Sequence, residues 1–585
     1  MRQTAYALFP AIVSLVLLSA CQMPGTTASP GDPPAVAITG YSGSFSYSVD
    51  AGTSPKDVYF VFSNTSVNST SYSKPSVSGL SVDGFALPPV ESQPGGAADQ
   101  ASLKARLHES NRDILASIDA LPSRSGSIAG AIPSPSPPLA DSVDQAGMLW
   151  DIGTSMADIQ VGSHCRSVGG AVTVADSSTR RLNIWVSDEC WSADGFTEGT
   201  GAIAASPSSK RHVVTQTMVD ALSARFLAAG AGNDIYDWVF AIAGAEWGPP
   251  AASNLIPFSG EITILLSDIE QDNADNGGIV GYFWAGNNFK TSSVPTSNAR
   301  VMFVIDAEMY ANPNASGSSS TGGSGWAPTH YWAEEVYSTL AHEFQHMIQF
   351  YQKGILARGD GKTADTWINE MCSQLVEDLV ADKLGVRGPR GVLPSDGGAG
   401  PAGNPYGRIP DFNQYLSLGL TKSGMESYSV EDYAFSYAFG AWLIRNFGGA
   451  SFVRNVVQDP RTDSGCVTAA VASVRGKSVD MGELIQRWAV AILGSSRTDM
   501  PYGLRCNSGG WISSSAGGLA YNLGSIDFFN YSPAPRFILA DGTLPSGVFA
   551  KASNVYYKAA SGLVGSRTWS LVVPEGIRFS VFVGP

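Results

Sequence analysis

The sequence predicts an α+β fold, in which a long region of mixed helices and strands lies between two β-rich regions. Residues 36–87 and 507–585 carry the alternating apolar and polar pattern that is typical of strands. Two segments in the middle of the chain, residues 332–351 and 367–384, instead carry the apolar spacing or the capping residues of helices. Because the chain has 585 residues, it is long enough for about two to four domains with separate cores.

The first residues predict export. Arg2 gives a positive start, and residues 7–18 form an apolar stretch that is too short for a membrane span but typical of a signal peptide, residues 1–20. The following Leu-Ser-Ala-Cys resembles a bacterial lipobox. This resemblance implies that Cys21 becomes a lipidated N-terminus, anchored in the cell envelope outside the cytoplasm. Gln22 resembles the sorting signal of outer-membrane lipoproteins, if the host has an outer membrane; an ordinary secretory signal is the alternative.

The rest of the chain divides by composition. Residues 21–35 are rich in Pro, Gly, Thr and Ser, which predicts a flexible tether. Residues 36–145 form the N-terminal β-rich region, which also contains a helix-like run at 101–121 and a Pro/Ser-rich linker at 122–138. Residues 146–506 form the mixed region, with strands expected at 260–269 and 298–310 and a helix at 213–229. Residues 507–585 form the C-terminal β-rich region.

Cysteines and charge limit the compartment and the partners. In an oxidising compartment, Cys165 to Cys190 and Cys466 to Cys506 are the expected disulfides, which leaves Cys372 as a buried thiol. No second apolar run reaches the length of a membrane span. The net charge of −15 argues against nucleic acid as a partner.

The most informative motif is His-Glu-Phe-Gln-His at residues 342–346. On a helix, His342 and His346 stand one turn apart on one face, so both imidazoles can reach one tetrahedral metal ion. Glu343 lies beside them, where a carboxylate can act as general base and then as general acid in metal-assisted hydrolysis. A solvated, His-rich helix surface is the alternative. The helical apolar spacing of residues 332–351 favours the metal site.

A catalytic zinc ion needs a third protein ligand. No histidine follows His346, which leaves a carboxylate as the strongest downstream candidate. The helix predicted at 367–384, between Asp365 and Gly385, offers Glu370, Glu377 and Asp378. For the last two, an exposed acidic helix face is the alternative.

The motifs resemble those of the hyicolysin-type (M30) zinc metallopeptidases of the gluzincin group. The resemblance covers residues 236–449 and rests on HEFQHMIQF, TWINEMCSQLVEDL and the helix that ends in NFGG, with upstream pieces such as ITILLSDI and VMFVIDAEM. It implies a gluzincin-like metallopeptidase catalytic domain, flanked by N-terminal and C-terminal β-rich regions, with one catalytic zinc ion held by His342, His346 and Glu370. In the gluzincin pattern, an Asp that supports a zinc-bound histidine stands where this chain has Gln374, which puts support from that position in doubt.

The resemblance also suggests a residue that stabilises the oxyanion. Residues 429–449 resemble the gluzincin aminopeptidase helix whose leading Tyr polarises the scissile carbonyl, which places Tyr433 in that role. Tyr437, one turn further along, is the second candidate. For either tyrosine, packing in the core is the alternative.

A second metal site has a weaker signal. Acidic residues cluster at short spacing, as they do in calcium loops, with Asn273, Asn276 and Gly277 among them: Asp268, Glu270, Asp272 and Asp275. Ile279 stands where a calcium loop has its bidentate Glu, so an acidic turn is favoured over a Ca²⁺ site.

These observations predict a membrane-tethered, extracytoplasmic zinc endopeptidase that acts on a protein or peptide substrate. A surface lipoprotein that serves as an adhesin or binding module, with an inactive peptidase fold, is the first alternative. A zinc hydrolase that acts on bonds other than peptide bonds is the second.

Overall fold

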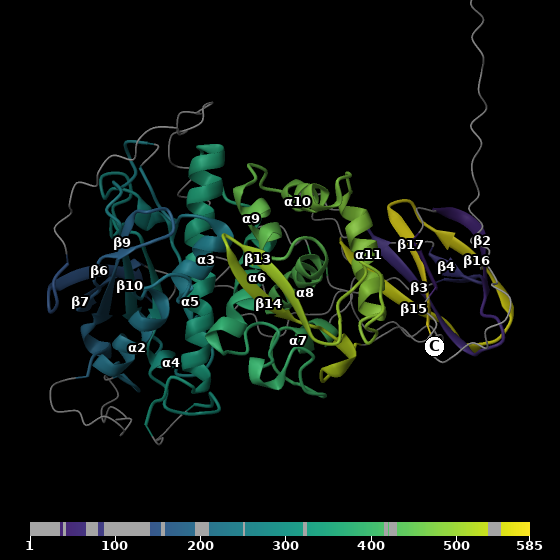
Figure 1. Ribbon diagram of the computed structural model, residues 1–585, viewed down its shortest axis with the longest axis horizontal. Coiled ribbons are helices and arrows are strands. Elements are labelled where there is room, and N and C mark those ends of the chain that lie inside the picture. The colour runs from purple at the N-terminus through teal and green to yellow at the C-terminus, as the bar shows by residue number, and fades with distance from the viewer. Residues whose placement is uncertain are drawn as a thin grey trace, which may run out of the picture.

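The computed structural model describes residues 35–38, 42–65, 80–86, 141–153, 158–192, 210–249, 252–319, 325–414, 419–420, 430–535 and 552–584. A large sheet lies at one end of the molecule, helices form the middle, and a β-sandwich lies at the other end (Figure 1). This arrangement confirms the α+β class. The expected signal peptide, the lipidation site Cys21, the helix-like run at 101–121 and the linker at 122–138 lie outside the described residues.

The large sheet has seven strands in the order β11-β12-β10-β9-β7-β6, with β8 paired to β9. Its strands are β6 (Ala146–Ile152), β7 (Asp158–Val168), β8 (Val172–Thr173), β9 (Thr179–Ser187), β10 (Glu261–Ser267), β11 (Gly281–Tyr282) and β12 (Met302–Asp306). The central strands β9, β10 and β12 are parallel, and their apolar residues are buried on both faces of the sheet. Along β10, for example, Ile264 and Leu266 face the main core, whereas Leu265 belongs to a separate cluster on the other face.

The sheet curls until its two edges meet. The hydroxyl of Tyr282 on the edge strand β11 donates a hydrogen bond of 2.7 Å to Asp151 Oδ1 on the opposite edge strand, β6. The second apolar cluster, which includes Leu149, Trp185 and Val304, fills the inside of this curl. The other face remains available to the helices.

The helical body packs against that other face of the sheet. Its helices are α2 (Gln216–Phe226), α3 (Ile235–Ala243), α4 (Ala307–Tyr310), α5 (Tyr331–Gln349), α6 (Thr366–Leu384), α7 (Ile409–Gln414), α8 (Val430–Asn446), α9 (Ala450–Gln458), α10 (Gly465–Arg475) and α11 (Met481–Leu493). The two predicted central helices, 332–351 and 367–384, correspond to α5 and α6. Helix α6 ends where expected, because Gly385 takes the left-handed conformation with φ of 74°.

Helices α5 and α6 pack on each other, and α6 also packs on α8. A π-helical segment, η5 (Phe350–Arg358), continues α5. A hairpin of β13 (Trp511–Ala516) and β14 (Leu519–Gly524) covers α6 and α9. The α5–α6 pair is therefore enclosed by structure on several sides, which explains why most of its residues are buried.

The β-sandwich is built from both ends of the chain. One sheet has the order β1-β17-β3-β15 and the other β2-β16-β4-β5. The strands are β1 (Ala35–Ile38), β2 (Gly43–Asp50), β3 (Lys56–Asn64), β4 (Ser81–Val82), β5 (Phe85–Ala86), β15 (Ser553–Leu563), β16 (Ser566–Val573) and β17 (Ile577–Gly584). The sequence pattern indicates strands at both ends but does not show that they pair with one another.

The sandwich is attached to the helical body through α11. Gln486 Nε2 donates hydrogen bonds to Phe579 O at 3.2 Å and to Ser580 Oγ at 3.1 Å. Arg578 forms an ion pair of 2.8 Å with Asp480, the residue before α11. These contacts connect the last strand of the chain to the helices.

The expected disulfides are wrong. Cys165, Cys190, Cys372, Cys466 and Cys506 are all free and buried. Cys165 belongs to the cluster inside the curled sheet, whereas Cys190 belongs to the main core on the other face. The expectation failed because closeness in sequence does not place two side chains on the same face of a sheet. Among the described residues, no helix is long and apolar enough to cross a membrane.

Candidate metal centre

Helices α5 and α6 bring His342, His346 and Glu370 together. All three side chains are buried, and their potential ligand atoms lie within 4.8 Å of one another. His342 Nε2 is 3.1 Å from Glu370 Oε2, and His346 Nε2 is 3.6 Å from Glu370 Oε1. In a tetrahedral zinc site with bonds of about 2.0–2.2 Å, neighbouring ligand atoms lie about 3.3–3.5 Å apart. The three residues therefore fit one zinc ion.

Each histidine is oriented by a hydrogen bond on the nitrogen that faces away from Glu370. His342 Nδ1 donates to Glu377 Oε1 at 2.6 Å, and His346 Nδ1 lies 3.0 Å from Asn369 Oδ1. This arrangement fixes the tautomers, because an Nδ1–H group leaves the Nε2 lone pair free to bind a metal ion. Glu377 thus lies on the far side of the His342 ring, where it orients the ring.

The carboxylates around His342 change its proton affinity. Burial alone would lower the pKa of His342, but hydrogen bonds to Glu370 and Glu377 raise it to about 9. The pKa of Glu377 is lowered, because its hydrogen bonds with His342 and Ser338 outweigh the effect of burial. In the metal-free protein both ring nitrogens of His342 therefore carry a proton at neutral pH, and a bound cation would replace the proton on Nε2.

Glu343 is buried on α5 next to His342, with 3% of its surface exposed. Its negative charge contributes to the raised pKa of His342. This placement suits a group that exchanges protons beside a metal ion.

Asp378 and Gln374, which also lie on α6, form contacts that connect α6 to α8. Asp378 accepts hydrogen bonds from Tyr437 at 3.1 Å and from Arg445 at 2.9 Å, in a buried ion pair. Gln374 Nε2 donates to Ser436 Oγ at 3.1 Å on α8. Gln374 thus connects two helices, and the support that the gluzincin pattern gives to a histidine comes here from Glu377 and Asn369.

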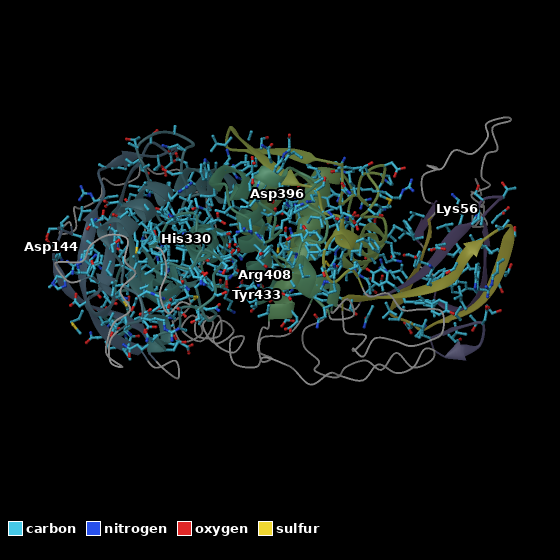
Figure 2. The ribbon with its side chains drawn as sticks, turned by 90° about the horizontal axis from the view of Figure 1, so that it is seen from below. Lys56, Asp144, His330, Asp396, Arg408 and Tyr433 are labelled. Carbon is cyan, nitrogen blue, oxygen red and sulfur yellow. The ribbon has the colours of Figure 1, made fainter. Side chains whose placement is uncertain are left out.

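The two candidate tyrosines differ in their contacts. Tyr437 donates a hydrogen bond to Asp378 of the buried ion pair, whereas Tyr433 lies outside that ion pair. Its side chain lies in the first turn of α8 and is 5% exposed, whereas Tyr437 is fully buried and bound to Asp378. The guanidinium of Arg408 lies over the ring of Tyr433, with Cζ 5.4 Å from the ring centroid. Figure 2 shows Arg408 and Tyr433 next to each other near the middle of the molecule.

The acidic turn after β10 differs from a calcium site. Asp268 is fully buried and paired with Lys210, and Asp275 binds Arg211 at 2.6 Å and His212 at 3.0 Å. Within the part of the chain that the structure describes, His342, His346 and Glu370 form the only grouping suited to a metal ion. The contacts of Asp268 and Asp275 fit the acidic turn that the sequence favours.

The orienting roles of Asn369 and Glu377, and the contact of Arg408 with Tyr433, did not emerge from the sequence. For Glu377 a signal exists, because it follows Glu370 by seven residues, or two helical turns, and so lies on the same face of α6. Asn369 is adjacent to the ligand and offers no periodic signal. Arg408 lies in a loop before α7, far from the motifs in sequence.

The buried His-His-Glu group is a set of ligands that suits a metallopeptidase. The Peptidase M30 family model matches residues 171–583, which is more than half of the chain, so the protein belongs to the Peptidase M30 family. This result confirms the family that the motifs indicated.

The chain is distantly similar to two known proteins. The chain is 24% identical over 242 residues to the neutral metalloprotease ShpI of Staphylococcus hyicus. That match covers 40% of this chain and 47% of ShpI, so the chain spans about half the length of this relative. The solved structure of Legionella pneumophila aminopeptidase A in complex with aspartic acid covers 57% of this chain and 31% of that chain. The identity to that chain is 9%, and the TM-score is 0.27.

Proposed function

We propose that this protein is a zinc metalloendopeptidase with a gluzincin-like catalytic domain, which hydrolyses peptide bonds in proteins or peptides. The observation that carries this proposal is the buried His342, His346 and Glu370 group, in which both histidines are held with Nε2 towards one carboxylate. Membership of the M30 family and the likeness to a neutral metalloprotease support it.

In this proposal His342, His346 and Glu370 hold the zinc ion, and Glu377 and Asn369 fix the two imidazole rings. A bound zinc ion would act as a Lewis acid, which would polarise the scissile carbonyl and lower the pKa of water in the site. Glu343 takes a proton from the attacking water and delivers it to the leaving amine. Tyr433 donates a hydrogen bond from its hydroxyl to the developing oxyanion.

We further propose that the enzyme acts outside the cytoplasm and is anchored in the cell envelope through a lipid on Cys21. The support comes from the Leu-Ser-Ala-Cys sequence at residues 18–21. Mass spectrometry of the membrane fraction should find a diacylglyceryl group on the mature N-terminal cysteine. A Cys21→Ala protein should leave the membrane fraction, and its retention there would contradict the anchor.

The catalytic role is tested with the wild-type protein and Glu343→Gln. Wild-type protein should contain about one zinc ion, as the single ligand set implies, and should cleave casein in a chelator-sensitive reaction. Glu343→Gln should keep the zinc and lose the activity, because an amide cannot accept the proton. A fully active Glu343→Gln protein would disprove the mechanism. A wild-type protein that holds zinc but cleaves nothing would favour an adhesin or binding module.

A further inference from the structure

We propose that Arg408 is a positioning residue, which holds the ring of Tyr433 in the orientation that directs its hydroxyl to the oxyanion. This inference rests on the proposed peptidase function. Arg408 is half-buried, and its Cζ lies 5.4 Å from the centroid of the Tyr433 ring. A cation at this distance over an aromatic face is attracted by the ring and favours one ring orientation.

The backbone of Arg408 is fixed by two hydrogen bonds. Its backbone N–H donates to Pro389 O at 2.9 Å, and its carbonyl accepts from Phe412 N at 3.1 Å, which starts α7. The ring of Phe412 packs edge-on against Phe435 of α8, with centroids 4.9 Å apart. Arg408 thus directly precedes α7, and Tyr433 lies on α8, which packs against α7. The contact between the two side chains is therefore part of a fixed arrangement.

The charge of Arg408 is not used in a direct ion pair. Among the described residues, no carboxylate lies within ion-pair distance of its guanidinium, although Asp411 and Glu335 are close enough for their pKa values to be influenced by it. Within the described part of the chain, the contact that the guanidinium of Arg408 makes is with the Tyr433 ring.

Positioning predicts a specific kinetic pattern. Without Arg408 the Tyr433 hydroxyl would spend less time in the productive orientation, so transition-state stabilisation would fall while substrate binding would not. Loss of Tyr433 itself should be more harmful, because it removes the donor to the oxyanion.

A double-mutant cycle with zinc-loaded protein and one peptide substrate tests the inference. Arg408→Gln should lower kcat by about tenfold with little change in KM, and Tyr433→Phe should lower kcat by about a hundredfold. In the Tyr433→Phe background, Arg408→Gln should cost nothing more. Arg408→Lys should recover part of the activity, since it keeps a cation near the ring. All variants should retain the wild-type zinc content.

Arg567→Gln is the matched control, because Arg567 lies over Trp569 at 4.8 Å in the β-sandwich and should leave kcat unchanged. The inference is overturned if Arg408→Gln lowers kcat by the same factor with and without the Tyr433 hydroxyl, or if it changes only KM. A wild-type protein with zinc but without proteolysis would be a different result. That result would disprove the peptidase function, and the role of Arg408 with it.

Discussion

Two clusters of acidic and basic side chains lie at different places in this protein, and they have opposite chemistry. Between α5 and α6, Glu370 faces the Nε2 atoms of two histidines, whose other nitrogens are already bound. In the turn after β10, Asp268 and Asp275 face the permanent cations Lys210 and Arg211. The first cluster can accept a zinc ion by releasing a proton, whereas the second already contains its counter-charges. Carboxylate density alone therefore does not identify a metal site.

Removal of the carboxylate ligand should have the largest effect on zinc binding. Glu370→Ala leaves two protein ligands, so we expect zinc affinity to fall by more than about a thousandfold and proteolysis to disappear. Zinc content after dialysis against a weak chelator measures this loss. Asp275→Ala, in the other cluster, serves as the control and should leave the zinc content unchanged. Zinc retained by Glu370→Ala but lost in Glu377→Ala would show that the third ligand is Glu377.

Removing one of the groups that orient a histidine should have a smaller effect. Glu377→Gln and Asn369→Ala should each lower zinc affinity by about 10- to 100-fold, because the imidazole loses its fixed orientation. Competition with a fluorescent zinc chelator measures both affinities. Equal affinities for wild type and both variants would show that packing alone holds the rings.

The acidic turn should respond in stability and not in zinc binding. Lys210→Met leaves Asp268 buried without its ion-pair partner, which should lower the free energy of unfolding by about 3–5 kcal/mol. Urea denaturation of the zinc-loaded protein measures the change. An unchanged free energy of unfolding would mean that water reaches Asp268 and replaces the lysine.

The smallest expected effect is a pH dependence of the free energy of unfolding, caused by Glu308 near the acidic turn. Burial raises the pKa of Glu308, in the short helix α4 that follows β12, to about 8. A carboxyl group with a raised pKa in the folded protein contributes stability that is complete below its unfolded pKa of 4.5 and is lost as the pH rises towards 8. Glu308→Gln should remove this loss, which we expect to be roughly a few kcal/mol. Parallel pH profiles of unfolding for both proteins would contradict the assignment.

The sequence predicts the metal centre better than the ends of the molecule, for a physical reason. His342, Glu343 and His346 are placed by the geometry of a single helix, which the sequence predicts directly. The choice of Glu370 over Glu377 and Asp378 followed from the resemblance to the gluzincin pattern. The β-sandwich instead requires β3 to pair with β15 and β17, about five hundred residues away, and no local pattern records that pairing. The incorrect disulfide between Cys165 and Cys190 has a different cause, because these two side chains lie on opposite faces of the large sheet.

Anomalous diffraction at the zinc edge, measured on a crystal of the wild-type protein, tests the central claim most directly. We predict one strong peak, bound by His342 Nε2, His346 Nε2 and Glu370, with Glu377 and Asn369 on the outer nitrogens of the two rings. A peak in the acidic turn beside Asp268, or one in which Glu377 replaces Glu370 as ligand, would contradict this account.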